Sequence, residues 1–247
     1  GILAPWIAGH WINDIGHRRT LSNGFHRNKD NNLLGVEFLL SEDLHEAKSI
    51  LEEKKIRYLI LTDITPNAND YARIVGKENA DYVFKTIYHP PEGGTRISFQ
   101  PTQKFHQLIS TRLYTEDGNG IGILTPGVFR LVYETPEKWM VDNEEVNAIK
   151  VFEYVKGAII RGFGKGESSI HLSVPIRTNS GRKFLYQLDS KVAPQGVYQV
   201  ILPYSQKDSP YDTCAMGPYT LLIGKKKYQV SVDEKMVLQG KTIILNE

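Results

Sequence analysis

The sequence predicts an α+β fold, with a helical N-terminal part packed on a β-rich, sandwich-like or barrel-like C-terminal part. Helix-type patterns occur up to about residue 115, and strand-type patterns follow from about residue 127. The change of pattern coincides with a turn-forming cluster, Glu-Asp-Gly-Asn-Gly, at 116–120. We therefore expect a mainly helical part at 1–120 and a β-rich part at 121–247, together forming one compact unit.

Three helices are expected in the first part. The run 41–55 carries acids in its first turn and lysines in its last, which favours a helix through its dipole. Thr65 and Pro66 are typical of a helix start, and that helix should continue to Gly76. A third helix is expected over 101–114. Between the first two, the β-branched and aromatic run 56–63 predicts a buried strand.

Strand-like runs dominate the second part, at 127–134, 148–160 and in several segments after residue 196 that should add about five short strands. The run 168–190 alternates on both sides of Asn179-Ser180-Gly181, which predicts a β-hairpin. Short strands at this spacing are typical of a sandwich or barrel.

The composition is that of an ordinary globular protein, with 40% hydrophobic and 23% charged residues among 247. A net charge of +2 gives no reason to expect a nucleic-acid partner. A single cysteine, Cys214, excludes an internal disulfide and a cysteine-based zinc site. No apolar run approaches the ~20 residues that span a bilayer. Because the chain starts at Gly1 rather than Met, we interpret it as a fragment or a processed chain.

No standard enzyme signature is present in the sequence. The run 162–169, GFGKGESS, lacks the Gly-Lys-Ser/Thr ending of a phosphate-binding loop, so we interpret it as a strand connection. His10 and His17 are two helical turns apart, but a metal site would need Asp14 or His26 as a third ligand. Surface or hydrogen-bonded histidines are the preferred interpretation.

Tryptophans and glycines crowd the segment 1–28, which we expect to be largely a loop. An exposed tryptophan offers a large flat contact and an N–H donor, so Trp6 and Trp11 fit a recognition surface. From the residues alone, the alternative that both tryptophans fill the core is preferred.

The same segment, GILAPWIAGHWINDIGHRRTLSNGFH, resembles the region of the Trp-Trp-Asp-Tyr-Gly signature in oligosaccharyltransferase catalytic subunits, particularly the archaeal form, AglB. Gly9-His10-Trp11-Ile12, Gly16-His17-Arg18 and Asn23-Gly24 match that region in order and spacing. Further similar runs lie at 41–63, 129–135, 149–158, 177–187 and 196–205, so the resemblance covers nearly the whole chain.

The resemblance implies the outward-facing C-terminal domain of a membrane glycosyltransferase. Such an enzyme transfers a dolichol-linked oligosaccharide to the Asn of an Asn-x-Ser/Thr sequon in an acceptor polypeptide. In the family, a divalent metal (Mn or Mg) and the activating acids belong to the membrane part. We therefore expect no catalytic residue and no bound metal in this chain, no activity from it in isolation, and a location at the extracellular face of the cell membrane.

By the same resemblance, the acceptor-peptide residues are Pro5, Trp6, Ile7, Ala8 and Gly9 at the signature, and Asn67, Asp70 and Ile74 in a second element. We expect the signature segment and the 66–76 helix to lie side by side. Asn67 and Asp70 depart from the family's charged pair, and a plain helix surface explains both of them equally well.

Ile7 stands where the family has an aspartate that accepts the proton of the Ser/Thr hydroxyl. An isoleucine cannot accept it, and an unpaired buried hydroxyl costs about 1–3 kcal/mol. Either another acceptor replaces the aspartate, with Asp14 the nearest candidate, or the pocket is degenerate, or the sequence has been altered.

The alternative function is a non-catalytic extracellular module that binds a peptide or a carbohydrate through Trp6 and Trp11. The sequence upstream of Gly1 distinguishes the two hypotheses, because only the enzyme needs preceding hydrophobic spans with acidic outward-facing loops.

Overall fold

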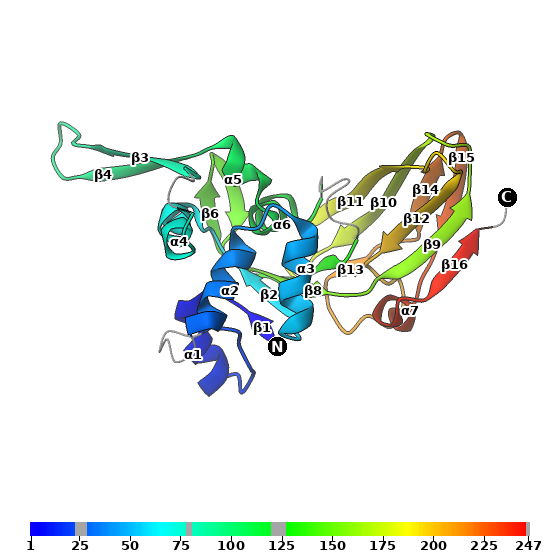
Figure 1. Cartoon of the computed structure of the whole chain (residues 1–247), viewed down its shortest axis with the longest axis horizontal. Coiled ribbons are helices and arrows are strands. Elements are labelled where there is room, and N and C mark those ends of the chain that lie inside the picture. Colours follow the sequence, from blue (N-terminus) through cyan, green and yellow to red (C-terminus); the bar gives the residue numbers. More distant parts are fainter. Residues whose placement is uncertain (23–28, 78–80, 120–126, 246–247) are drawn as a thin grey trace. The chain divides into compact units, whose positions relative to one another are not determined.

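The structure, a computed structural model, describes residues 1–22, 29–77, 81–119 and 127–245, without the side chains of Trp6 and Ile7. Helices and strands are both abundant and the described sheets are open, so the mixed α+β class is confirmed (Figure 1). The chain forms two compact units. Unit 1 comprises 1–56, 60–115 and 137–148, and unit 2 comprises 57–59, 116–136 and 149–247.

Unit 1 contains six α-helices among the described residues, one 3-10 helix and several short strands. In chain order these are β1 (Ile2–Leu3), α1 (Trp6–Asp14), α2 (Lys29–Leu39), α3 (Leu44–Glu53), η1 (Thr65–Asn67), α4 (Ala68–Ile74), β3 (Val83–Tyr88), β4 (Arg96–Pro101), α5 (Gln103–Gln107), α6 (Ile109–Glu116), β6 (Lys138–Val141) and β7 (Glu144–Asn147). The unit boundaries divide strand β2 (Tyr58–Leu61) after Leu59 and leave the last residue of α6 in unit 2.

The N-terminal segment is helical over Trp6–Asp14, so the expectation of a mostly irregular loop is wrong. Pro5 sits before the helix in an extended conformation, and its carbonyl accepts a hydrogen bond from Ala8 N at 2.9 Å. The helix is followed by His17 at φ 48, a left-handed conformation. His10 and His17 therefore do not share one helix face.

The three expected helices exist with different ends. Helix α3 is capped by Asp43, whose carboxylate accepts from the His45 and Glu46 amides, rather than beginning at Ser41. The Thr65 hydroxyl bonds Asp63 instead of capping a helix. The 101–114 run is broken by the extended backbone of Leu108 into α5 and α6.

Unit 1 also contains elements that the sequence analysis did not predict, among them helix α2 and the β3–β4 hairpin. Helix α2 contains Asn31, Asn32 and Gly35, which are weak helix formers, and it is held by packing of its buried face. The antiparallel hairpin β3–β4 has a run of exposed side chains without regular alternation of burial, so the period-two signal is absent.

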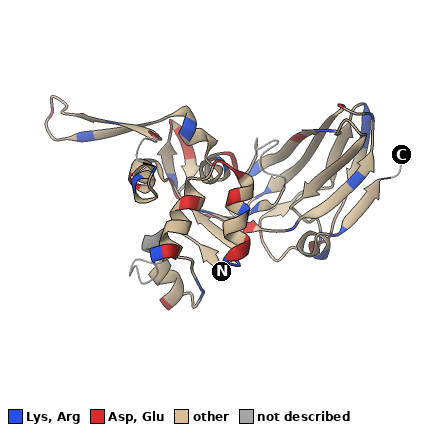
Figure 2. Ribbon diagram, in the orientation of Figure 1, with Lys and Arg blue, Asp and Glu red and all other residues tan. Residues whose placement is uncertain are grey.

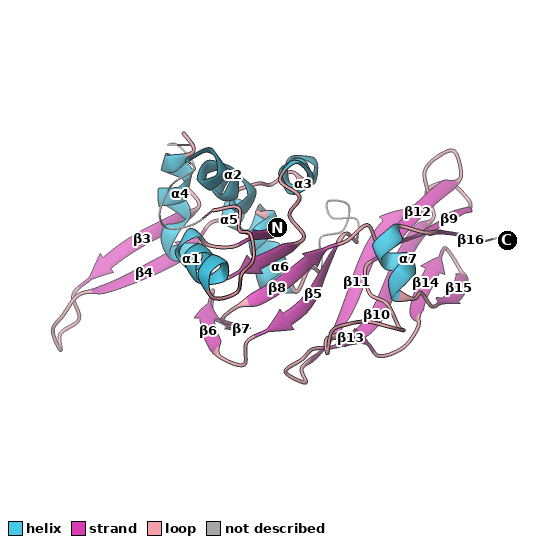
Figure 3. Ribbon diagram, turned by 90° about the horizontal axis from the view of Figure 1, so that it is seen from below, coloured by secondary structure: helices cyan, strands magenta, loops and turns pink. Residues whose placement is uncertain are grey.

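Unit 2 is dominated by strands. They are β5 (Phe129–Glu134), β8 (Lys150–Tyr154), β9 (Ala158–Phe163), β10 (Ser169–Arg177), β11 (Lys183–Lys191), β12 (Val197–Leu202), β13 (Cys214–Ala215), β14 (Tyr219–Ile223), β15 (Lys226–Val230) and β16 (Thr242–Leu245), with helix α7 at Glu234–Gln239. The orders β11-β10-β14-β15, with β13 on β10, and β12-β9-β16 define two open sheets (Figure 3). One apolar core takes residues from both.

The hairpin predicted around Asn179-Ser180-Gly181 is confirmed. Strands β10 and β11 pair without a bulge from Ser169↔Lys191 to Arg177↔Lys183. By contrast, the run 148–160 is two strands, separated where Gly157 adopts φ 70. The end of the chain is not all strand, because Asp233 caps α7 and Gly240, in the left-handed conformation, ends it.

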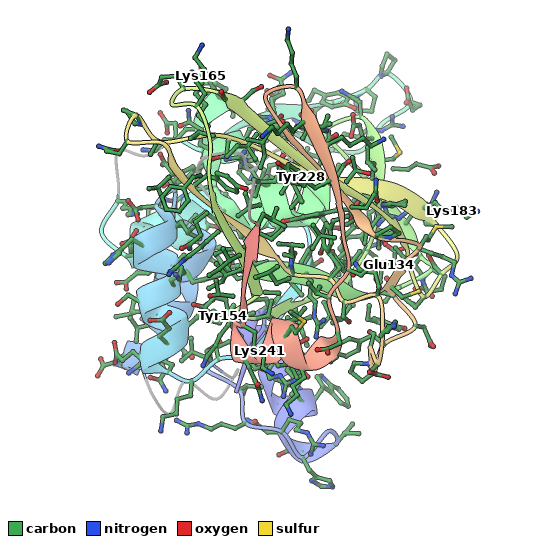
Figure 4. All side chains as sticks on the ribbon, turned by 90° about the vertical axis from the view of Figure 1, so that its right-hand side faces the viewer. Glu134, Tyr154, Lys165, Lys183, Tyr228 and Lys241 are labelled. Carbon is green, nitrogen blue, oxygen red and sulfur yellow. The ribbon has the colours of Figure 1, made fainter. Side chains whose placement is uncertain are left out.

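Two clusters of buried charges hold β5 and β8 within unit 2. Arg130 on β5, 2% exposed, donates to Glu153 on β8 and to Glu234 on α7, both at 2.6 Å. At the other end of β5, Arg182 bridges the buried Glu134 and Asp117, and Lys150 also pairs with Asp117 at 2.6 Å. In Figure 4, Lys165 and Lys183 lie at the periphery, whereas Glu134 is fully buried.

Candidate functional site

A small cavity in unit 1 lies beside Pro5, at the start of helix α1. It has about 10 Å³ of space, close to the minimum that one water molecule needs. The N-terminal segment and helix α4 both reach it, the former through Ala4 and Pro5 and the latter through Tyr71. Ser22 and the α2 residues Asn32, Gly35, Val36 and Leu39 complete the lining.

Backbone hydrogen bonds fix the chain on the N-terminal side of this cavity. Ile2 N donates to Arg19 O at 2.9 Å, and Leu21 N donates to Ile2 O at 2.8 Å. Asn13, near the end of α1, accepts from the Thr20 amide and hydroxyl at 3.2 and 3.1 Å. The segment before α1 is therefore hydrogen-bonded to residues 19–21, and the next residue, Ser22, lines the cavity.

Three lining residues, Ser22, Asn32 and Tyr71, carry polar side chains, and the Ser22 hydroxyl donates to Ala4 O at 3.4 Å. Ser22 and Asn32 are both buried. Burial raises the pKa of Tyr71, so its phenol stays protonated at neutral pH and can donate or accept a hydrogen bond. The cavity is therefore lined by uncharged residues and has space for about one water-sized group.

A second, larger cleft opens between helix α4 and the β3–β4 hairpin, with about 130 Å³ of space. Its lining residues are Thr65, Pro66, Asn69, Asp70, Arg73, Val83, Lys85 and Phe99. Asn69 fixes the two walls, because its side chain donates to Val83 O at 2.7 Å and accepts from the Tyr82 and Val83 amides at 3.0 and 3.1 Å. Asp70 forms an exposed ion pair with Arg73 at 2.9 Å.

The residues predicted from the signature are only partly brought together. Pro5 lines the small cavity, Gly9 is buried within α1, and Ala8 is half-buried there. The side chains of Trp6 and Ile7 lie outside the described part of the structure, as do residues Asn23, Gly24 and His26.

On the second element, Asp70 lines the larger cleft, not the cavity beside Pro5. Asn67 and Ile74, at the ends of η1 and α4, are exposed and line neither space. Asp14, the candidate replacement acceptor, is exposed near the end of α1 and is absent from the cavity lining.

Sequence reasoning missed Asn32, Tyr71 and Arg73. The i, i+3 spacing of Asp70 and Arg73 on a predicted helix is a signal that could have identified that pair. No comparable pattern marks Asn32 or Tyr71, because they approach Pro5 through tertiary packing.

Within the described ranges, no three His, Cys, Asp or Glu side chains gather closely enough to bind a metal ion. His171, in strand β10, instead pairs with Asp189 at 2.6 Å and is partly exposed. The described helices also include none with the length and apolar character needed to cross a membrane.

Comparison with known proteins places the chain beside archaeal glycosylation enzymes. The family model of the archaeal glycosylation protein B long peripheral domain matches residues 157–243. Dolichyl-phosphooligosaccharide-protein glycotransferase 3 of Archaeoglobus fulgidus is 22% identical over an alignment that covers 100% of this chain and 37% of that protein.

Two solved structures of an A. fulgidus oligosaccharyltransferase share the fold. The complex with Zn and sulfate has a TM-score of 0.79 at 21% identity, and covers 99% of this chain and 40% of that one. The form tethered to an acceptor peptide containing the NVT sequon has a TM-score of 0.78 at 20% identity, with 99% and 38% covered. The chain thus spans well under half the length of these relatives. The expected resemblance of the chain to archaeal oligosaccharyltransferases is confirmed.

Proposed function

From this similarity to archaeal oligosaccharyltransferases, we propose that the chain is the extracellular C-terminal domain of a membrane enzyme that glycosylates the Asn of Asn-x-Ser/Thr sequons. In this proposal the domain binds the acceptor polypeptide and recognises the Ser/Thr side chain. The oligosaccharide comes from a dolichol-linked donor held by a membrane region. The A. fulgidus relatives, named for a dolichyl donor and solved with an NVT peptide, support both partners.

The observation that carries the proposal is the cavity shared by Pro5 and Tyr71. Pro5, from the segment 5–9 that the family resemblance assigns to acceptor binding, and Tyr71, from the helix α4 that carries Asp70 and Ile74, both line this one space. Its size and uncharged polar lining suit a single hydroxyl group better than a charged or bulky side chain.

Asn32 is our choice for the group that replaces the family's aspartate. Its side chain is buried in the lining and carries a carbonyl oxygen, which can accept the proton that Ile7 cannot. A neutral acceptor forms a weaker hydrogen bond than a carboxylate, so we expect recognition of Ser/Thr with less discrimination than an aspartate gives.

The divalent metal of the reaction is assigned to the membrane region in this proposal. Among the described residues, acids such as Glu153 are engaged in ion pairs, here with Arg130. Zn accompanies a relative that is more than twice as long as this chain. The contribution of this domain is to bind and orient the acceptor.

The test is a glycosylation assay of the full-length protein with a lipid-linked donor and matched peptides that differ only in Thr or Ala at the third sequon position. We expect the Thr peptide to be modified and Asn32→Leu to reduce the Thr/Ala rate ratio several-fold. Val36→Leu, a change at an apolar position of the same lining, is the control for altered packing. Peptide binding without any glycan transfer would support the non-catalytic module instead.

A further inference from the structure

The β3–β4 hairpin projects from the rest of unit 1 (Figures 1 and 3). Its strands pair antiparallel from Val83↔Pro101 to Tyr88↔Arg96, and six residues per strand extend roughly 20 Å. Its base is held by Asn69 and by Thr102, whose hydroxyl donates to Tyr82 O at 3.0 Å. The hairpin is therefore an ordered projection with a fixed base.

Large apolar side chains are exposed on both faces of this hairpin. Directly paired residues share a face, so Ile87 and Ile97 lie on one face, and Phe84 and Tyr88 lie on the other. Their exposed fractions are 56% and 48% for the isoleucines, 59% for the phenylalanine and 44% for the tyrosine. Both faces thus present apolar surface to the surroundings.

The β10–β11 hairpin of unit 2 shows what a hairpin against a protein core looks like. One face carries buried Ile170, Leu172, Val174 and Ile176, whereas the other carries mostly polar residues such as His171 and Arg177. A protein partner that covered one side of β3–β4 would leave the apolar side chains of the other side in water. A medium that surrounds both faces explains the pattern.

The charged residues fit such a medium at its boundary with water. Figure 2 shows few charges on the hairpin. The Lys, Arg, Asp and Glu residues within 83–101 are Lys85, Glu92 and Arg96. Glu92 and Arg96 pair at 3.0 Å. Long cationic side chains beside aromatic and aliphatic ones are typical of the membrane interface, where the stem contacts lipid and the charge reaches water.

We propose that the β3–β4 hairpin inserts into the boundary between headgroups and acyl chains of a lipid bilayer, with Ile87 and Ile97 in contact with lipid. The depth is limited, because β3 and β4 pair only with each other among the described strands. Their outer edges leave backbone groups that need water or headgroups as partners. This inference is independent of the proposed enzymatic function.

Vesicle flotation of the 247-residue chain tests the proposal, with vesicles of phosphatidylcholine alone and of phosphatidylcholine with phosphatidylglycerol. We expect binding to both, and a loss of about tenfold or more in binding for the double variant Ile87→Ser, Ile97→Ser. The control is Phe163→Ser, which removes a 69% exposed side chain from strand β9 of unit 2 and should leave binding unchanged. Binding that needs phosphatidylglycerol and survives the double substitution would overturn the proposal.

A labelled variant reports the contact itself. Ile97→Cys is introduced with Cys214→Ser, which removes the native thiol, and carries a dye whose emission shifts to the blue in an apolar medium. The expected result is a blue shift on adding vesicles, with no shift from the same dye at Phe163→Cys. Equal shifts at both positions, or a shift caused by self-association without vesicles, would contradict lipid insertion.

Discussion

Pro5 and Tyr71 line one small cavity of unit 1, although one precedes the first helix and the other lies in helix α4. This relationship joins the segment that resembles a sequon-binding signature to the helix that should carry the second binding element. It is the basis of our proposal that this part of the protein recognises the Ser/Thr side chain of the acceptor.

The isolated 247-residue chain should show no glycan transfer, with or without added Mn²⁺ or Mg²⁺. The described residues provide no cluster of acids suited to holding a divalent cation. The measurement is turnover of a lipid-linked donor and a sequon peptide by the purified chain, with the full-length protein as positive control. Turnover by the chain alone would show that the proposed division between domain and membrane region is wrong.

Removing the hydroxyl groups of Ser110 and Thr111, which are adjacent on helix α6, should change the free energy of unfolding in different ways. Ser110 Oγ donates to Leu39 O at 2.6 Å, so Ser110→Ala should lower the free energy of unfolding by about 1–2 kcal/mol. Thr111 Oγ1 is buried and has no hydrogen-bond partner among the described residues, so Thr111→Val should be neutral or slightly stabilising. Denaturant titration of both variants checks this, and equal destabilisation would contradict the assigned contacts.

The free energy of unfolding should decrease at acidic pH because the carboxylate of Glu134 becomes protonated. Burial raises the pKa of its carboxyl, but hydrogen bonds from Arg182, Ser180 and Thr178 outweigh that effect and leave the pKa below its usual value of 4.5. A carboxyl with a lowered folded-state pKa stabilises the fold above its ordinary pKa. That contribution is lost as the pH falls through 4.5 towards the folded-state value.

The matching variant is Glu134→Gln. It should destabilise unit 2 by about 2–3 kcal/mol near neutral pH. This loss is smaller than for a buried pair with a single partner, because Arg182 still forms its ion pair with Asp117. The difference from wild type should shrink as the pH drops below 4.5. Glu145→Gln, at an exposed ion pair with Lys138, is the control and should change stability by less than about 1 kcal/mol. A constant Glu134→Gln deficit across this range would refute the titration.

Local patterns were sufficient where neighbouring residues decide the structure. The alternation around Asn179-Ser180-Gly181 predicted the β10–β11 hairpin, because turn and strand signals agree there. Local patterns failed where contacts between residues distant in sequence determine the structure. Helix α2 depends on its buried face, and the break at Leu108 leaves no mark in the apolar pattern.

The candidate site shows the same limit. The resemblance selected Pro5 and the region of α4, and Pro5 and Tyr71 do line one cavity. Asn32 could not be selected, since nothing around it in the sequence indicates that α2 lines the same cavity as Pro5. The same holds for the Arg130–Glu234 pair, whose members are separated by most of unit 2 along the chain.

The most direct test of the central claim is the Thr/Ala rate ratio of the full-length protein before and after Ile7→Asp. An aspartate restores a charged acceptor at the position the family uses, and a hydrogen bond to a charged group contributes roughly 1.5–3 kcal/mol. We predict that the preference for the Thr peptide rises by about tenfold or more. A wild-type protein that already prefers Thr strongly, with a ratio that Ile7→Asp leaves unchanged, would contradict the assignment of residues 5–9 to hydroxyl recognition.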